Sequence, residues 1–295
     1  MQQFAQWNER DPLKEVIIGR YQEYNRHPQY AELVNKDQKE SLPHLDELQK
    51  DFEQLRKTLQ KEGVKVHIPH YIGKFVYDQL TPRDIGIAIG NQFLICNMRR
   101  KSRRYEAAGI FSILEHFSSG EPNLVIPDSP TCHIEGGDVI LDDYTLFVAR
   151  SQRTNEEGIE FLKRTFGHLF QVIAVEGRKM DEYEGILHLD CMFNIIDTNL
   201  AVIYEPGFLN IPSELSNYYE LMHVNQTEQA ALTTNVLSIG HGKVLSRDHA
   251  DCRAFNDRLR KKGLEVIEVP FDAAPSTGGS IRCCTLPLVR EKSEG

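Results

Sequence analysis

The sequence predicts a mixed α/β fold in which about five similar units are arranged around a centre. Short β-rich hairpins recur at intervals of roughly 45–55 residues, a spacing that is typical of repeats. Helical stretches and further strands lie in the gaps between the hairpins. We therefore expect ββαβ-type repeats in a single domain over residues 1–295, rather than one open parallel sheet.

The N-terminal part supplies a strand, a helix and a second strand. The strand expected at residues 15–19 would begin or close the set of repeats. Apolar side chains at three- and four-residue spacing predict a helix over residues 45–59, and a strand follows at residues 64–68. Residues 21–44 are polar and lack a clear period, so they form either a lid over a site or a solvated insertion.

Four segments share a pattern of two β-rich arms around a polar or glycine turn, which predicts hairpins. They are residues 85–96, 138–148, 192–204 and 235–245. Helices are expected at residues 156–166 and 252–262, and a strand at residues 264–269. The last strand is expected to begin at Cys283.

Composition narrows the function classes. The chain has 295 residues, of which 40% are hydrophobic and 26% charged, and its net charge of −9 argues against a nucleic-acid partner. No stretch approaches the ~18 apolar residues that a membrane span needs, and no signal peptide is visible. The six cysteines are scattered and lack CxxC spacing, so we expect a cytoplasmic protein with reduced thiols.

Each expected unit places polar residues at the end of its hairpin. Asp84 precedes the first hairpin and Glu135 precedes the second. His188 and Asp190 open the third, and strand alternation would send both side chains to the same face. Cys283 follows a glycine pair at the last strand. In a radial array these positions converge on one axis.

A pocket with three acids, one imidazole and one thiol could bind a planar cation and react with it. Carboxylates hold a guanidinium group through bidentate hydrogen bonds. A thiolate can attack its central carbon, and an imidazole can protonate the leaving amine and then activate a second nucleophile. A metal ion is the competing interpretation, but the residues lack a known ligand spacing, so we expect neither a metal nor a cofactor.

Several motifs resemble those of guanidino-modifying enzymes. Residues 8–20, 82–84 and 188–196 are similar to amidinotransferases. Residues 134–138 look like those of arginine deiminases, and residues 151–155 are similar to dimethylarginine dimethylaminohydrolases. The resemblance covers nearly the whole chain, and it implies a five-bladed β/α propeller, or pentein, with pseudo-fivefold symmetry.

The resemblance also implies roles for particular residues. Cys283 would be the nucleophile and His188 the general acid and base. Asp84, Glu135 and Asp190 would hold the guanidinium group, Arg153 would meet a substrate carboxylate, and Arg103 or Arg104 would be a second such residue.

These observations favour a cysteine-dependent hydrolase of an arginine-like guanidino compound, acting through an amidino-thioether on Cys283. Asp190 needs an N–H donor, which argues against a dimethylated nitrogen beside it. An amidinotransferase that resolves the same intermediate with an acceptor amine is the alternative. A ureido substrate such as citrulline and a non-catalytic propeller that binds a partner are two further hypotheses. A homodimer would be unsurprising.

Overall fold

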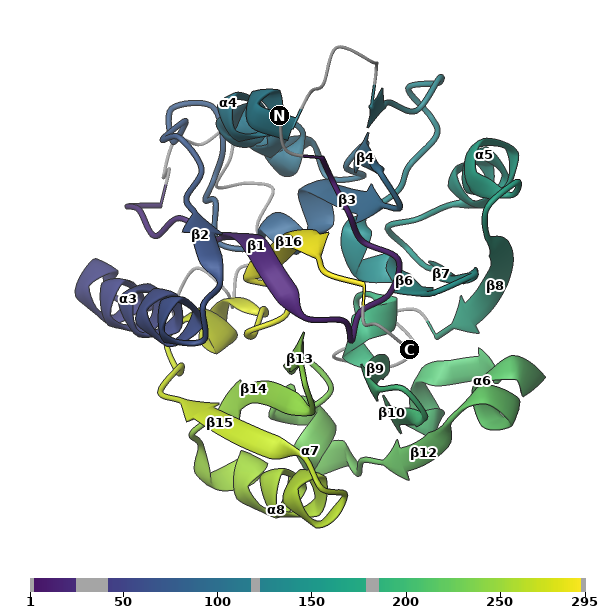
Figure 1. The fold of residues 1–295 in the computed structure, drawn as a ribbon. Coiled ribbons are helices and arrows are strands. Elements are labelled where there is room, and N and C mark those ends of the chain that lie inside the picture. The colour runs from purple at the N-terminus through teal and green to yellow at the C-terminus, as the bar shows by residue number, and fades with distance from the viewer. Residues whose placement is uncertain (1–2, 25–41, 118–122, 179–185, 293–295) are drawn as a thin grey trace.

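Five separate sheets surround the centre of the molecule in the computed structural model, which describes residues 3–24, 42–117, 123–178 and 186–292 (Figure 1). The first sheet contains β16 (Thr285–Arg290), β1 (Leu13–Ile18) and β2 (Lys65–His67), and the second contains β3 (Gly86–Ile89), β4 (Gln92–Ile95) and β5 (Leu124–Val125). The third contains β6 (Val139–Asp142), β7 (Thr145–Arg150), β8 (Gln171–Gly177) and β11 (Phe208–Asn210). The fourth contains β9 (Phe193–Asp197), β10 (Leu200–Ile203) and β12 (Glu220–His223), and the fifth β13 (Leu237–Gly240), β14 (Lys243–Arg247) and β15 (Glu265–Val269).

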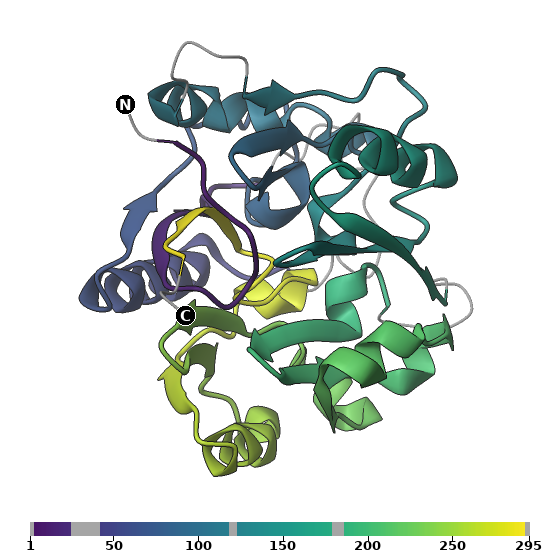
Figure 2. The same cartoon turned by 45° about the vertical axis from the view of Figure 1, so that its right-hand side comes forward.

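The same pairing order recurs in every sheet. Two strands pair antiparallel, as in the β3–β4 and β13–β14 hairpins, and the second of them pairs parallel with a third strand. The four predicted hairpins are therefore confirmed. The first sheet uses the two ends of the chain, because β1 pairs antiparallel with β16 and parallel with β2 (Figure 2). The five sheets fit the propeller-like arrangement that the repeat spacing predicts.

Helices lie towards the outside of this array (Figure 1). They are α3 (Leu45–Lys61), α4 (Phe111–Leu114), α5 (Glu156–Phe166), α6 (Ser213–Tyr218), α7 (Gln226–Ala230) and α8 (Arg253–Lys261). The expected apolar face of α3 is buried, which explains why this amphipathic segment is helical. The side chain of Asn155 caps α5 by accepting a hydrogen bond from the Gly158 amide. Among the described residues, no helix combines the length and the apolar character that crossing a bilayer requires.

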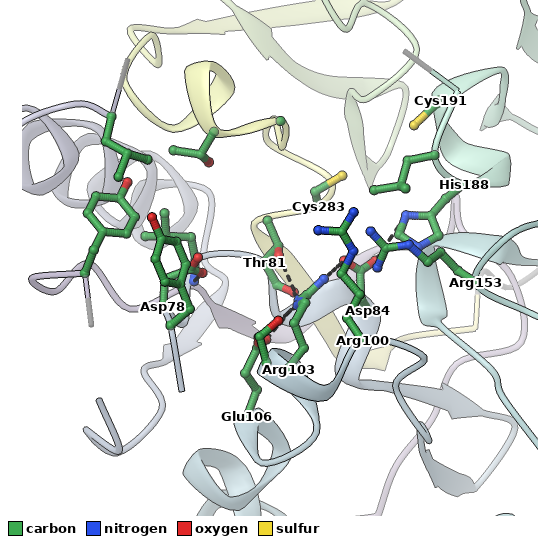
Figure 3. Close-up of a pocket in the computed structure, with 18 residues that line it drawn as sticks. Asp78, Thr81, Asp84, Arg100, Arg103, Glu106, Arg153, His188, Cys191 and Cys283 are labelled. Atoms are coloured by element: carbon green, nitrogen blue, oxygen red, sulfur yellow. Dashed lines mark hydrogen bonds and ion pairs between the residues drawn. The ribbon is translucent and has the colours of Figure 1, made fainter. Parts of the chain in front are cut away.

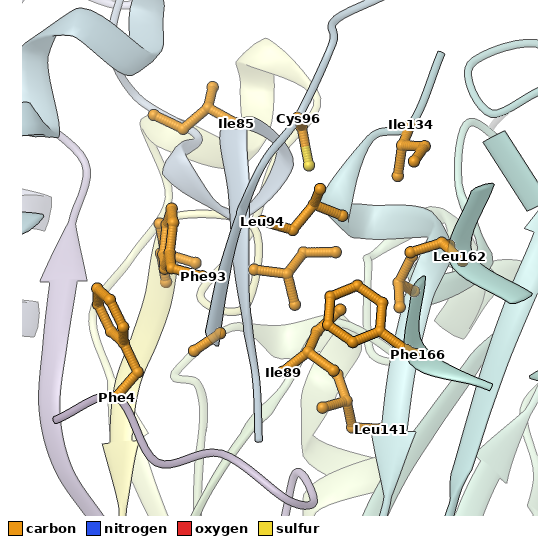
Figure 4. Close-up of a cluster of buried hydrophobic side chains, with 14 of the residues drawn as sticks. Phe4, Ile85, Ile89, Phe93, Leu94, Cys96, Ile134, Leu141, Leu162 and Phe166 are labelled. Carbon is orange, nitrogen blue, oxygen red and sulfur yellow. The ribbon is translucent and has the colours of Figure 1, made fainter. Parts of the chain in front are cut away.

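The core joins neighbouring sheets and thereby places the turns that precede them. Leu94 of β4 and Leu141 of β6 pack with Leu162 and Phe166 of α5 in one buried cluster (Figure 4). All four side chains are fully buried. This packing holds the second sheet against the third, so that the turns leading into β3 and β6 also lie next to each other.

Two local predictions were wrong. The last strand begins at Thr285, and Cys283 lies in the turn before it, where the Cys284 amide donates to the carbonyl of Ser280. Asp190 lies in a short 3-10 turn, Leu189–Cys191, with His188 just before it, rather than on a strand. The turn forms because the Cys191 amide donates to the carbonyl of His188. Residues 25–41 lie outside the described residues, so the lid prediction stays a prediction.

Candidate active site

Turns that precede the first strand of three sheets line one cavity of about 130 Å³, and a fourth such turn lies behind it. Asp84 lies in the turn before β3, His188 in the turn before β9 and Cys283 in the turn before β16, and all three line the cavity (Figure 3). Glu135 lies in the turn before β6 and contacts His188 from behind. The structure thus brings together residues that are up to 199 positions apart in the sequence.

Two glycines allow these turns to approach one another. A Cβ atom on Gly136 would lie 2.0 Å from the carbonyl oxygen of Arg83. A Cβ atom on Gly137 would lie 2.8 Å from Asp84 Oδ1 and 2.8 Å from the His188 ring. Because no side chain fits between Asp84 and His188, the close approach of the acid to the imidazole requires glycine at position 137.

His188 lies between carboxylates. Its Nε2 is 2.9 Å from Glu135 Oε2, and its Nδ1 is 3.7 Å from Asp84 Oδ1. Asp138 accepts a hydrogen bond from the Leu189 amide at 3.1 Å and so fixes the backbone beside the ring. Burial alone would lower the pKa of His188, but Asp84, Asp138 and Glu135 raise it to about 9. The imidazole is therefore protonated at neutral pH and can donate a proton.

Glu135 is fully buried, and both of its oxygens are occupied. Oε1 accepts a hydrogen bond from the Arg99 amide at 3.0 Å, and Oε2 contacts His188 and, at 3.2 Å, Arg153 Nη1. Burial would raise the pKa of Glu135, but His188 and Arg153 lower it to about 2. The structure places Glu135 behind His188, whereas the sequence led us to expect it at the guanidinium group.

Cys283 is held by a residue that the sequence analysis missed, Asn235. The Asn235 side chain accepts a hydrogen bond from the Cys283 amide at 3.0 Å and donates one to Sγ at 3.0 Å. Sγ also lies 3.8 Å from Asp190 Oδ2. Burial first, and then the Asp190 and Asp84 carboxylates, raise the pKa of Cys283 well above its ordinary value. Asn235 precedes the fourth hairpin, as Asp84 precedes the first, and that position is the signal that would have identified it.

Asp190 lies next to Cys283 and is fully buried. One of its oxygens is 3.4 Å from Arg282 Nε and 3.8 Å from Cys283 Sγ, and the other is 3.9 Å from Cys191 Sγ. Burial raises the pKa of Asp190, and the nearby Arg282 opposes that rise. A cation placed beside Cys283 would therefore stabilise the ionised carboxylate.

The structure distinguishes the two candidate arginines. Arg103 lines the cavity and makes ion pairs with Asp84 Oδ2 at 2.7 Å and Glu106 Oε1 at 2.8 Å, and it also donates to Thr81. Arg104 is exposed and is not one of the described residues that line the cavity. Arg103 thus holds Asp84, whose other oxygen, Oδ1, is buried and has no hydrogen-bond partner among the described residues.

Other cations also face the cavity. Arg153, which the sequence analysis selected, lines it together with Arg100 (Figure 3). Tyr24, Tyr77 and Leu42 supply apolar surface at another part of the cavity wall. Because Arg153 is paired with Glu135, which contacts His188, the arginines lie at the acidic and thiol-bearing part of the cavity (Figure 3).

The Asp84, Glu135 and His188 side chains could in principle hold a metal ion, because one ligand atom from each lies within 4.8 Å of the others. The protonation of His188 opposes that use, since the raised pKa leaves no free lone pair at neutral pH. The two carboxylates are also paired with Arg103 and Arg153. These residues fit an organic cation better than a metal ion, and the expected absence of a cofactor stays a prediction.

The chain is similar to one protein-family model and to several known proteins. Residues 23–290 match the model of the family described as N,N dimethylarginine dimethylhydrolase, eukaryotic. The chain is 36% identical over 217 residues to the uncharacterized protein YkgA of Bacillus subtilis (strain 168), which covers 72% of this chain and 70% of that protein. It is 27% identical over 285 residues to the arginine deiminase of Listeria welshimeri serovar 6b, covering 80% of this chain and 69% of that protein.

Solved structures share the fold. The amidinotransferase SxtG from Microseira wollei superposes with a TM-score of 0.82 at 19% identity, covering 98% of both chains. A mutant of DDAH from Pseudomonas aeruginosa, complexed with citrulline, superposes with a TM-score of 0.75 at 16% identity, covering 94% of this chain and 99% of that one.

Proposed function

Because the chain belongs to the N,N dimethylarginine dimethylhydrolase family, we propose that it is a cysteine-dependent hydrolase of an arginine-like guanidino compound. Membership of this family makes it an enzyme that acts on guanidino C–N bonds, and the hypothesis of a non-catalytic binding protein is set aside. The observation that carries the proposal is the arrangement of Cys283, His188 and Asp84 around one cavity.

The guanidinium group would bind between Asp84 and Asp190, beside Cys283. Asp84 Oδ1 is buried, lies 3.7 Å from His188 Nδ1 and accepts no hydrogen bond among the described residues, so it can accept one from an N–H donor of a ligand. Asp190 Oδ2 lies 3.8 Å from Cys283 Sγ, which places a second acceptor next to the nucleophile. A planar cation bound to both carboxylates would present its central carbon to the sulfur.

Substrate binding would also activate the thiol. In the structure, the pKa of Cys283 is raised by burial and by the negative charges of Asp190 and Asp84. A guanidinium cation neutralises those charges and adds a positive charge near the sulfur, which lowers the free energy of the thiolate. The protonated ring of His188 lies in the same cavity and adds to this effect.

The reaction then needs two steps. The Cys283 thiol first loses its proton to solvent, and the thiolate then forms a bond to the guanidino carbon. The C–N bond breaks as His188 gives its proton to the departing amine, leaving an amidino-thioether. Neutral His188 next takes a proton from water, which attacks the same carbon. The C–S bond breaks, a ureido product leaves and the thiolate is restored. Glu135 holds the imidazole in position throughout.

The acidic part of the cavity indicates an unmethylated guanidinium group. Asp84 and Asp190 are buried acceptors, and a dimethylated nitrogen would leave one of them without an N–H donor from the substrate. Arg153 and Arg100, on the cavity wall, would interact with an anionic group of the substrate. We therefore propose arginine, or a close analogue with a free guanidinium group, as the substrate class.

A product assay tests the proposal. Purified enzyme is incubated with arginine, methylated arginines, guanidinobutyrate and citrulline, each with and without acceptor amines. We expect ammonia release from a free guanidino compound without an acceptor, and loss of that release in Cys283→Ser. Cys284→Ala is a matched control, since the Cys284 side chain is buried away from the cavity lining and should not be needed for turnover.

The other outcomes distinguish the alternatives. Turnover only with an added amine would establish an amidinotransferase, and turnover of citrulline would establish a ureido substrate. Full activity of Cys283→Ser would contradict the covalent mechanism. We also propose that the five sheets form a closed five-bladed propeller; a homodimer stays a prediction.

A further inference from the structure

We propose that Asn235 is a positioning residue that stabilises the thiolate form of Cys283. The inference rests on the proposed role of Cys283 as the nucleophile. The other four sheets are preceded by turns that carry Asp84, Glu135, His188 and Cys283. The turn before β13, the first strand of the fifth sheet, carries Asn235, and its side chain reaches Cys283 across 48 positions of sequence.

The orientation of the Asn235 amide is determined by chemistry. The Cys283 backbone N–H can only donate, so the Asn235 atom that lies 3.0 Å from it must be the oxygen. The other end of the amide, 3.0 Å from Cys283 Sγ, is therefore the NH₂ group. One side chain thus holds the backbone of Cys283 and directs an N–H donor at its sulfur.

This donor matters most when the thiol is ionised. Among the described residues, the hydrogen-bond partners of Sγ are Asn235 Nδ2 and Asp190 Oδ2. Asp190 can accept a hydrogen bond from the thiol, but its charge opposes the thiolate. Asn235 is the partner that donates, and a hydrogen bond to a charged acceptor is stronger than one to a neutral acceptor.

The surrounding structure keeps the Asn235 amide in place. Asn235 is 2% exposed and is not among the described residues that line the cavity, so it lies behind Cys283. Its carbonyl accepts a hydrogen bond from the Arg282 amide. The Asn194 side chain donates to the carbonyls of Thr234 and Val236, on either side of Asn235. The Asn235 amide is therefore held in this orientation before any substrate binds.

The isosteric variant Asn235→Asp separates the two hydrogen bonds. An aspartate oxygen still accepts from the Cys283 amide, but the NH₂ donor that faces Sγ is replaced by an oxygen. The lost hydrogen bond to a charged acceptor raises the thiol pKa by about one to two units, and the negative charge of the new carboxylate raises it further. A more basic thiolate is also more nucleophilic, which offsets part of its lower abundance, so alkylation of Cys283 by iodoacetamide at fixed pH should slow at least about threefold. The rate is measured on resting enzyme, with Cys283→Ser as the blank.

Thr234→Ala is the matched control in the same turn. Thr234 donates to the carbonyl of Asp190 and makes no hydrogen bond to Cys283 among those that the described residues form. This variant removes a hydrogen bond of the same turn but keeps the Asn235 donor to Cys283, so its alkylation rate should match that of the wild type. Thermal melting of both variants checks that they are folded. An unchanged rate in Asn235→Asp, or an equal slowing in Thr234→Ala, would overturn the proposal.

Turnover supplies the second readout. Asn235→Asp should lower kcat about tenfold to hundredfold and leave KM unchanged, because the side chain acts on the sulfur and not on the substrate. A higher KM with unchanged kcat would contradict the inference. The alkylation measurement needs no turnover, so it can support or reject the role of Asn235 even where Cys283→Ser shows that the covalent mechanism is wrong.

Discussion

Arg103 positions Asp84, a carboxylate of the proposed site, at the scale of a single residue. Its guanidinium group joins Asp84 to the buried Glu106, so that Asp84 keeps one oxygen for a ligand. Arg103→Ala leaves Glu106 buried without its cation, and we expect a loss of unfolding free energy of about 3 kcal/mol. Turnover should fall about hundredfold because Asp84 loses its orientation.

The neighbouring arginine is the control. Arg104 is exposed, so Arg104→Ala should change the unfolding free energy by less than about 0.5 kcal/mol and leave turnover unchanged. Urea unfolding and steady-state kinetics of the two variants make the comparison. An equal loss of turnover in Arg103→Ala and Arg104→Ala would show that Arg103 does not position Asp84.

The buried imidazole should make stability depend on pH. The pKa of His188 is raised from about 6.5 to about 9, so the charged ring stabilises the folded state fully below pH 6.5. That contribution is lost as the pH rises from about 6.5 through about 9. The unfolding free energy of the wild type, relative to that of His188→Gln, should fall by on the order of 3 kcal/mol over this window. Urea unfolding of both proteins at pH 6 and pH 9.5 measures this change. An unfolding free-energy difference that is the same at both pH values would refute the raised pKa of His188.

At the scale of an element, the glycine turn before β6 is the sensitive point. In Gly137→Ala the added methyl group would lie 2.8 Å from both Asp84 Oδ1 and the His188 ring, so the ring must shift. We expect turnover to fall about tenfold to hundredfold while the protein still folds. Kinetics and circular dichroism provide the readouts.

A second glycine serves as a comparison for that variant. Gly242 lies in the β13–β14 turn at φ +67°, and a Cβ atom added there would have no heavy atom of the described residues within 4 Å. Gly242→Ala should cost about 1 kcal/mol through backbone strain and leave turnover unaffected. Equal loss of activity in both glycine variants would count against a steric role for Gly137.

The elements also show what the sequence can and cannot predict. The hairpins were predictable because their pairing is local and their arms surround a turn. The turns that carry the site were not, because their hydrogen bonds come from distant segments. Asp190 lies in a 3-10 turn that directly follows His188, and the Leu189 amide of this turn donates to Asp138, in the turn before β6. Strand alternation therefore gave the wrong local geometry for two residues that the fold still brings near the same cavity.

At the scale of the whole molecule, Glu9 links the two ends of the chain. Both of its oxygens bind Arg282, the neighbour of Cys283, at 2.9 and 3.1 Å, and all of these groups are buried. Glu9→Gln removes the countercharge of a buried cation, so the unfolding free energy should fall by about 3–5 kcal/mol at pH 7. Glu156→Gln, which breaks an exposed ion pair with Arg150, should cost less than about 1 kcal/mol.

The effect of Glu9 should depend on pH. Burial would raise the pKa of Glu9, but Arg282 and Arg83 lower it to about 2. Its stabilising contribution is therefore complete above about pH 4.5 and is lost as the pH falls towards 2. Urea unfolding should show that the difference in unfolding free energy between the wild type and Glu9→Gln is smaller at pH 3 than at pH 7. A gap that widens on acidification would contradict this ion pair.

The whole-molecule arrangement was predictable only in outline. The spacing of the hairpins indicated about five units, and the N-terminal strand was expected to begin or close the set. The partner of that strand, β16, lies near the other end of the chain, and no local pattern specifies such a pairing. Asn235 was missed for a related reason: an asparagine before a strand is ordinary turn chemistry until the fold places it against Cys283.

Trapping the covalent intermediate tests the central claim most directly. Enzyme mixed with arginine, or with whichever guanidino compound it turns over, is quenched in acid during turnover and its mass is measured intact and after digestion. We predict an amidino adduct on the peptide that contains Cys283, absent from Cys283→Ser and present in Cys284→Ala. Turnover of the same substrate with no adduct at Cys283, and with activity retained by Cys283→Ser, would contradict the proposed mechanism.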